Sequence, residues 1–178
     1  MGAISYIIIF LVFGLMGFQT DQDYETILWS SDTRLSWDDF RGDIPINNRA
    51  AAITASGITY RFSTSGTKEN IEVDFKIDTF FYPTKSWYQP QLCDEVILGH
   101  EQLHFDISEL YAREMKRRLD DELFTHGNVK AKVKSIYREI NIELDDFQNL
   151  YDAETDFSRD LDKQEEWKLK IAQALQEP

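Results

Sequence analysis

The sequence predicts an α+β fold in which a small antiparallel sheet packs on a helical subdomain. Apolar and polar side chains alternate between residues 71 and 78, which is typical of a half-buried strand. After Pro90, apolar residues recur at helical spacing as far as Leu119, which indicates a long amphipathic helix. Because strand-like patterns occupy the first half of the chain and helix-like patterns the second, the two kinds of element are expected to segregate, as in α+β proteins.

Length and composition limit the function classes. The chain has 178 residues, 42 % of them hydrophobic, which suits one domain with a core of its own. Its formal net charge of −13 argues against nucleic acid as a partner, because such binding needs a basic surface to neutralise phosphates. The same charge argues against the folded domain binding an anionic membrane surface. Cys93 is the only cysteine, so an internal disulfide framework is excluded.

Residues 1–20 differ from the rest of the chain. They contain no charged side chain, and the run from Ile4 to Phe18 is almost continuously apolar. This run is short for a transmembrane helix, which needs about 20 residues, and it suits a secretory signal peptide. Because basic residues and a small-residue cleavage pattern are missing, an uncleaved N-terminal anchor is the alternative. In either case we expect residues 21–178 to form one exported domain, periplasmic or extracellular, that meets a membrane only through an uncleaved N-terminus.

The strands come before the helices. Residues 24–48 are expected to form an irregular lead-in, punctuated by Gly42 and Pro45. Two strand patterns follow, over residues 51–63 and 71–82, with a turn signal at residues 65–67 between them. This arrangement predicts an antiparallel hairpin as the main part of the sheet.

Three helices are expected after the strands. The first begins at Pro90, a residue that suits the first turn of a helix, and runs to about Phe124, where residues 125–128 end it. The second runs from about Val129 into the 150s. The third covers about residues 163–175 and is anchored by Trp167, which, like the other tryptophans, is expected to pack between elements.

His100, Glu101 and His104 form the sharpest chemical pattern, His-Glu-x-x-His. On a helix, residues i and i+4 have Cβ atoms about 5–6 Å apart, so two imidazoles at this spacing can reach one Zn²⁺. The glutamate after the first histidine lies at the flank, where its carboxylate can contact a zinc-bound water, whose pKa zinc lowers to about 7. Glu101 would then act as the general base of a hydrolase.

A pattern this short also arises by chance, and the two imidazoles would then be hydrogen-bonded core residues. Three observations favour metal binding. Two of the chain's three histidines fall in the pattern, and the pattern lies inside a predicted helix. Both histidines also share the apolar stripe with residues such as Val96 and Ile107, where a buried imidazole needs a polar partner.

A catalytic zinc normally has three protein ligands and one open position, so a third ligand is needed. His126, the remaining histidine, lies about 33 Å beyond His104 along a continuous helix and is not expected to reach the site. An antiparallel second helix would instead return the carboxylates of Asp152, Glu154 and Asp156 towards residue 100. Helical periodicity places Glu154 on the inward stripe and Asp152 off it.

Residues 97–107 (ILGHEQLHFDI) and 109–113 (ELYAR) resemble the signature of an uncharacterised bacterial family, catalogued as domain of unknown function 922 (DUF922) and often labelled a secreted zinc-dependent protease. Further matching segments are 37–42 (WDDFRG), 51–54 (AAIT), 86–87 (SW), 151–155 (YDAET) and 164–167 (QEEW). The resemblance covers most of residues 29–170. It implies a zincin-like metallohydrolase domain in residues 21–178 with Zn²⁺ as cofactor. It also favours Asp152 as the third ligand, because the Tyr-Asp-x-x-Thr arrangement is the part that matches.

The chain departs from the family pattern at Phe157, where members often carry a histidine two residues after the matched threonine. This departure motivates one alternative, a non-catalytic exported module with a structural or vestigial metal site. Because Glu101 and both helix histidines remain, the favoured hypothesis is an exported zinc-dependent peptidase that acts on a peptide or protein substrate. Its zinc is expected to be held by His100, His104 and Asp152, with Asp106 as a candidate to orient a ligand histidine.

Overall fold

The computed structural model describes residues 25–46, 48–67 and 71–176. The predicted signal peptide or anchor over residues 1–20 lies outside the described residues. Within the described part of the chain, no helix is both long enough and apolar enough to cross a membrane.

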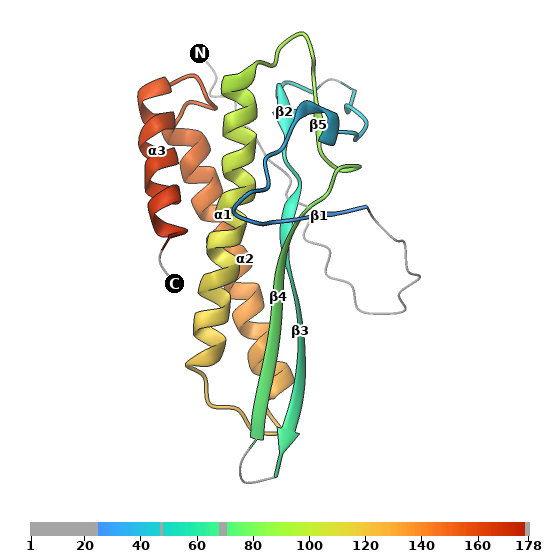
Figure 1. Cartoon of the computed structure of the whole chain (residues 1–178), viewed down its shortest axis with the longest axis vertical. Helices are drawn as coiled ribbons and strands as arrows, with labels where there is room; N and C mark the ends of the chain where they lie inside the picture. The colour runs from blue at the N-terminus through green and yellow to red at the C-terminus, as the bar shows by residue number, and fades with distance from the viewer. Residues whose placement is uncertain (1–24, 47, 68–70, 177–178) are drawn as a thin grey trace, which may run out of the picture.

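Two long helices form the centre of the molecule (Figure 1). Helix α1 spans Glu95–Asp120, and α2 spans Val129–Glu154. The Asp94 carboxylate caps α1 by accepting hydrogen bonds from the backbone N–H groups of Val96 and Ile97, each at 3.0 Å. The helix therefore begins after Pro90 rather than at it. It also ends one turn before Phe124, so the expected bounds were too wide at both ends.

The main sheet is a long antiparallel hairpin beside the two helices. Strand β3 (Ser56–Gly66) pairs with β4 (Ile71–Phe81) along its whole length, and the short β1 (Ile27–Leu28) adds to the other edge of β4. The hairpin predicted from the alternation is therefore confirmed. Its strand β3 continues to Gly66, into the segment that was predicted to turn.

The strand expected over residues 51–63 is divided between two sheets. Strand β2 (Ala52–Ile53) pairs with β5 (Trp87–Tyr88), and the chain joins the main sheet only at Ser56. The division falls at Thr54, whose hydroxyl donates a hydrogen bond of 3.1 Å to the backbone carbonyl of Glu101. This bond holds the end of β2 beside the first turns of α1, which carry the His-Glu-x-x-His pattern.

The main core lies between the hairpin and the facing sides of α1 and α2. Side chains from both helices form one buried cluster that includes Ile107, Met115, Val133 and Ile140. The apolar face of the hairpin covers this cluster with Tyr60, Phe62, Val73, Phe75 and Ile77. Burying a large apolar side chain contributes about 1.5–3 kcal/mol, so this interface supplies most of the driving force for the arrangement. The prediction of an α+β fold with a sheet packed on helices is confirmed.

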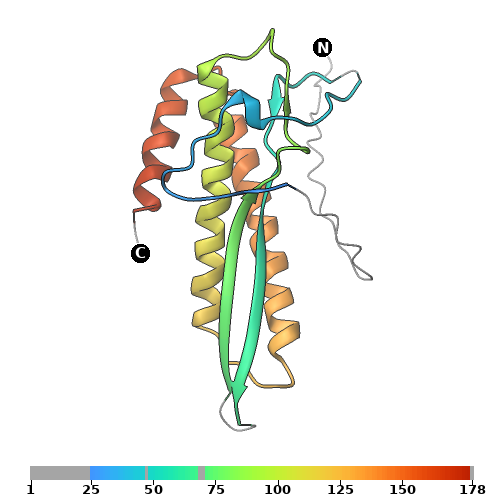
Figure 2. The ribbon, with the colours of Figure 1, turned by 45° about the vertical axis from the view of Figure 1, so that its right-hand side comes forward.

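Helix α3 (Leu161–Ala174) packs on the helices at the end that carries His100. In Figures 1 and 2 it lies on one side of α1, while the hairpin lies on the other. Trp167 is buried here, with its ring 5.3 Å from that of Tyr151 and 5.0 Å from that of Phe147, measured between centroids. The expected anchoring role of Trp167 is therefore confirmed.

The lead-in passes over the side of α1 that faces away from α2. The indole N–H of Trp29 donates to the Asp106 carboxylate at 2.9 Å, and the Gln102 amide donates to the same oxygen at 3.0 Å. Gln102 also accepts a hydrogen bond from the backbone N–H of Leu35 at 2.8 Å. Asp106 therefore secures the lead-in to α1, and the hypothesis that it orients a ligand histidine was wrong. Its position two residues after His104 points it to another face of the helix.

Gly42 lies where the lead-in contacts the segment between β4 and β5. A Cβ atom at this position would lie 2.9 Å from the Ser86 carbonyl oxygen and 3.0 Å from that of Thr84, and both contacts are with backbone that cannot easily move. We expect Gly42→Ala to lower the free energy of unfolding by about 1–3 kcal/mol, measured by urea denaturation. Gly99→Ala is the control: a Cβ there meets nothing within 4 Å, so the helix should gain about 0.5–1 kcal/mol. A Gly42→Ala variant as stable as the wild type would contradict this interpretation.

Candidate metal centre

Helix α1 places the two histidines of the pattern one turn apart on its buried face. His100 and His104 are 5 % and 8 % exposed, and their ring centroids are 4.9 Å apart. Both rings point away from solvent towards α2, because they lie on the same stripe as the core residues Leu103 and Ile107. Their Nε2 atoms approach to 3.3 Å. The expected pairing of the two imidazoles is therefore present.

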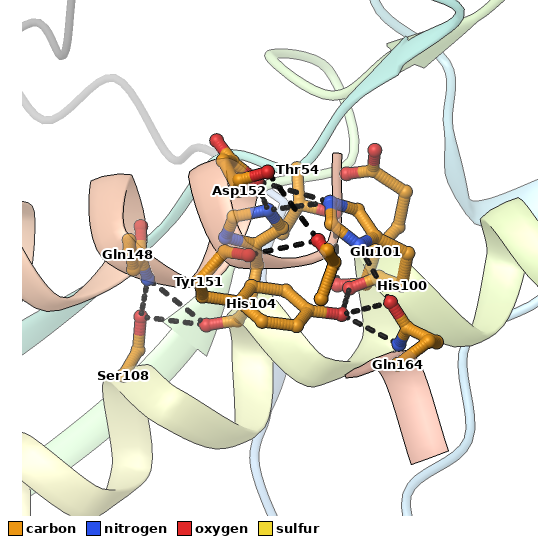
Figure 3. A network of polar contacts seen from close by, with 10 residues as sticks. Thr54, His100, Glu101, His104, Ser108, Gln148, Tyr151, Asp152 and Gln164 are labelled. Atoms are coloured by element: carbon orange, nitrogen blue, oxygen red, sulfur yellow. Dashed lines mark hydrogen bonds and ion pairs between the residues drawn. The ribbon is translucent and has the colours of Figure 1, made fainter. Parts of the chain in front are cut away.

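Helix α2 returns beside α1 and brings Asp152 to the same point (Figure 3). Its Oδ1 atom lies 3.0 Å from His100 Nε2 and 3.0 Å from His104 Nε2. His100, His104 and Asp152 thus form a buried group that could hold a metal ion. That these three side chains act as ligands stays a prediction.

The other candidate third ligands lie elsewhere. Glu154 is exposed and accepts a hydrogen bond of 2.9 Å from the Trp167 indole, so the periodicity that placed it inward was wrong. The error arose because the buried stripe at the end of α2 passes through the polar residue Gln148 to Tyr151 and Asp152, and a pattern of apolar residues does not show it. Asp156 lies beyond the helix and pairs with Arg159 at 2.8 Å. His126 is exposed in the connection between α1 and α2 and does not belong to the His-His-Asp group.

The three converging atoms have the chemistry and spacing of a metal site. Each can present a lone pair, and atoms of this kind at 3.0–3.3 Å repel unless a proton or a cation lies between them. Tetrahedral ligands at about 2.0–2.1 Å from Zn²⁺ lie about 3.3 Å from one another. The observed separations therefore fit a small divalent ion held by two imidazoles and one carboxylate.

The pKa shifts of Asp152 and His104 favour a negative charge on the carboxylate and a positive charge on the imidazole. Burial, the largest single contribution, raises the pKa of Asp152, but hydrogen bonds and charge from both histidines outweigh it and hold the pKa well below its usual range. Burial likewise lowers the pKa of His104, but the hydrogen bond and charge of Asp152, with the charge of Glu101, raise it above the ordinary histidine value. Asp152 is therefore a carboxylate at neutral pH, the form that binds metals.

Glu101 lies beside this group without joining it. The side chain is 6 % exposed, and its carboxylate accepts no hydrogen bond from any of the described residues. In the view of Figure 3 it points to the same side of α1 as the Asp152 carboxylate. The Glu101 oxygens are not among the buried side-chain atoms that lack a partner, so the carboxylate keeps some contact with solvent, as a group that exchanges protons with water requires.

Two further residues support the group. Tyr151, which precedes Asp152, is fully buried, and its ring stacks on His100 with centroids 4.5 Å apart and planes 20° apart. Burial raises the pKa of Tyr151 far above its ordinary value, so the hydroxyl stays protonated. Gln164, from the first turn of α3, contacts both the Tyr151 hydroxyl and His100. Sequence reasoning missed Gln164; its place in the matching segment 164–167 was the signal that could have found it.

A tight reversal connects α2 to α3. Asp156, Phe157 and Ser158 all have left-handed backbone, with φ of 48°, 53° and 71°, a conformation that costs about 1–2 kcal/mol per non-glycine residue. The backbone N–H of Phe157 donates to the Asp152 carbonyl at 2.9 Å, and that of Asp160 donates to the Thr155 carbonyl at 2.9 Å. The departure from the family pattern at Phe157 thus falls on this reversal, five residues after Asp152.

Comparison with known families agrees with the resemblance seen in the sequence. Residues 44–160, well over half of the chain, match the family described as "Bacterial protein of unknown function (DUF922)". This stretch contains His100, Glu101, His104 and Asp152. No curated protein and no solved structure matches the chain. The chain belongs to the bacterial DUF922 family, and it places a buried His-His-Asp group, able to hold a metal ion, within the region that defines that family.

Proposed function

We propose that the protein is a zinc-dependent hydrolase and that its substrate is a peptide or protein. One observation carries the proposal: three buried atoms that can each present a lone pair converge at 3.0–3.3 Å, and the Glu101 carboxylate, which no described residue hydrogen-bonds, follows His100 on the same helix. The first feature suits a metal ion, and the second suits proton transfer beside it.

The ligand set favours zinc among the common metal ions. Calcium and magnesium prefer sites made almost entirely of oxygen, whereas two imidazoles with one carboxylate are typical of catalytic zinc. A bound Zn²⁺ would supply Lewis-acid chemistry, which polarises a carbonyl group and acidifies water.

The protein's own residues then have separate tasks. His100, His104 and Asp152 would hold the ion in place, and the surrounding burial would limit access of bulk water. Glu101 would accept a proton from the attacking water and pass it to the amine of the leaving peptide, so that one water is consumed for each amide bond broken. The hydrogen bond from Thr54 to the Glu101 carbonyl would keep this turn of the helix in position.

The alternative is a non-catalytic exported module with a structural metal. The departure from the family pattern at Phe157 favours it, but the number of protein ligands in the group argues against it. Structural zinc sites are closed by four protein ligands. Within the described ranges, the group contains three ligand residues. Three ligands leave a position for water or substrate, which is the arrangement of a catalytic site.

Location and partners remain part of the proposal. The apolar run before residue 20 supports export to the periplasm or the cell exterior, with a membrane met only through an uncleaved N-terminus. The net charge of −13 supports a substrate other than nucleic acid.

Elemental analysis of the full chain, purified and reconstituted with Zn²⁺, tests the metal part of the proposal. We expect about one zinc per chain in the wild type and none in His104→Ala. The control is His126→Ala, because His126 is the exposed histidine outside the group and its loss should leave the zinc content unchanged. If the reconstituted wild type holds no zinc, the proposed function is wrong.

A further inference from the structure

Gln164 makes contacts that nothing in the proposed function uses. It is 3.0 Å from His100 Nδ1 through Oε1, and its Nε2 lies 2.6 Å from the Tyr151 hydroxyl. Gln164 comes from α3, beyond residue 160, where the family match ends. A residue of α3 therefore contacts His100 through Nδ1, the ring nitrogen that does not face Asp152 (Figure 3).

The proton positions in this contact follow from which atoms are donors. The amide oxygen of Gln164 can only accept, so a hydrogen bond to His100 Nδ1 requires a proton on that nitrogen. The amide nitrogen donates to the Tyr151 oxygen, and the Tyr151 hydroxyl can donate to the His100 carbonyl at 3.4 Å. Asp152 Oδ1, 3.0 Å from His100 Nε2, competes for the single proton of a neutral imidazole. A metal ion at Nε2 would remove this competition and leave the proton on Nδ1, where the Gln164 oxygen accepts it.

Neighbouring side chains also fix the orientation of the His100 ring. The fully buried Tyr151 ring stacks on one face of His100, and the Gln164 amide meets its edge. His104 has no such partner: its Nδ1 atom is buried and finds no hydrogen bond among the described residues. The two imidazoles are therefore held differently, and only His100 is oriented from α3.

We propose that Gln164, held by Tyr151, is a positioning residue that accepts the Nδ1–H of His100 and fixes the orientation of its ring, so that docking of α3 sets the affinity of the metal site. The inference rests on the proposed metal binding. Partners of this kind, which hydrogen-bond the second nitrogen of a ligand histidine, typically change metal affinity by about 10–100-fold. The left-handed reversal at residues 156–158 contributes by directing the chain from Asp152 back to α3.

Zinc affinity of the full chain, measured by competition with a chromogenic chelator, gives the first test. Gln164→Leu keeps the size of the side chain but removes the acceptor, and we expect it to raise the Kd for Zn²⁺ by about 10–100-fold. Gln164→Glu restores an acceptor for Nδ1–H and should bring the affinity back to within a few-fold of the wild type. Gln173→Leu makes the same change at an exposed position of the same helix and should have no effect. Equal affinities for wild type and Gln164→Leu, or equal losses for the two leucine variants, would overturn the proposal.

The Nδ1–H proton of His100 provides a readout that a purely structural role would not change. Two-dimensional ¹H–¹⁵N spectra of the imidazole groups, recorded on the zinc-loaded full chain, should show that this proton exchanges slowly with water in the wild type and in Gln164→Glu. In Gln164→Leu the proton has no acceptor and should exchange faster, with thermal unfolding recorded alongside. Equally slow exchange in Gln164→Leu would refute the inference. Failure of the wild type to take up zinc would instead count against the proposed function, so the two outcomes are distinguishable.

Discussion

Replacing Glu101 with glutamine is expected to abolish most peptide hydrolysis while leaving zinc bound. The amide has nearly the same shape as the carboxylate but cannot accept and release a proton at neutral pH. General acid–base groups typically contribute about 10²–10⁴-fold to a rate, so we expect a loss of that size in kcat. Zinc content should remain at about one per chain, because the carboxylate of Glu101 is outside the His-His-Asp group.

The measurement is cleavage of a defined peptide library by the zinc-loaded full chain, followed by mass spectrometry. Glu95→Gln is the matched control, since Glu95 is an exposed glutamate in the first turn of the same helix. This control should cut the same peptides at the wild-type rate. Cleavage by Glu101→Gln at the wild-type rate would remove Glu101 from the mechanism, although the metal group would stand. A wild type that binds zinc but cuts no peptide would favour the non-catalytic alternative.

Replacing Asp152 with asparagine is expected to remove the stabilisation that zinc gives to the folded protein. A ligand that binds only the folded state stabilises it by about 2.7 kcal/mol at a concentration 100 times its Kd. For a domain of this size, 1 kcal/mol corresponds to about 2–4 °C in Tm, so wild type should gain roughly 5–10 °C when zinc is added. The Asp152→Asn variant should gain little at the same zinc concentration, because the carboxylate charge that offsets the ion is gone.

Glu154→Gln separates Asp152 from its rival. Glu154 is exposed and bonded to Trp167, and glutamine can accept the same indole hydrogen bond. This variant should keep the full zinc-dependent shift in Tm. If instead Glu154→Gln loses the shift and Asp152→Asn keeps it, the His-His-Asp assignment is wrong and the periodicity argument for Glu154 is restored.

The histidine pair of the candidate metal centre was predictable because it depends only on local backbone geometry. His100 and His104 are four residues apart, and a helix brings such residues together whatever lies around it. The amphipathic stripe that predicts the helix is also a local pattern, as is the alternation of residues 71–78 that predicts β4. These features hold because helices and strands repeat every 3.6 and 2 residues, so the spacing alone assigns a face to each side chain.

The third member of the group depended on contacts between distant segments. Asp152 lies 48 residues after His104 in the chain, and its place opposite the two imidazoles is set by the packing of α2 on α1. Periodicity along α2 misplaced Glu154 because it counted only apolar residues, whereas the buried stripe at the end of α2 passes through the polar Gln148 to Tyr151 and Asp152. Only the resemblance to the family favoured the residue that the structure brings to the site.

By itself, therefore, the sequence determined the α+β class, the two histidines on one helix face and the glutamate beside them, because each depends on the regular geometry of a single element. The tertiary structure decided the rest: that Asp152 completes the group, that Asp106 holds the lead-in instead of a histidine, and that Gln164 meets the far edge of His100. These contacts join side chains from separate elements, and their positions follow from how the elements pack and how the reversal after α2 turns the chain, which no local pattern encodes.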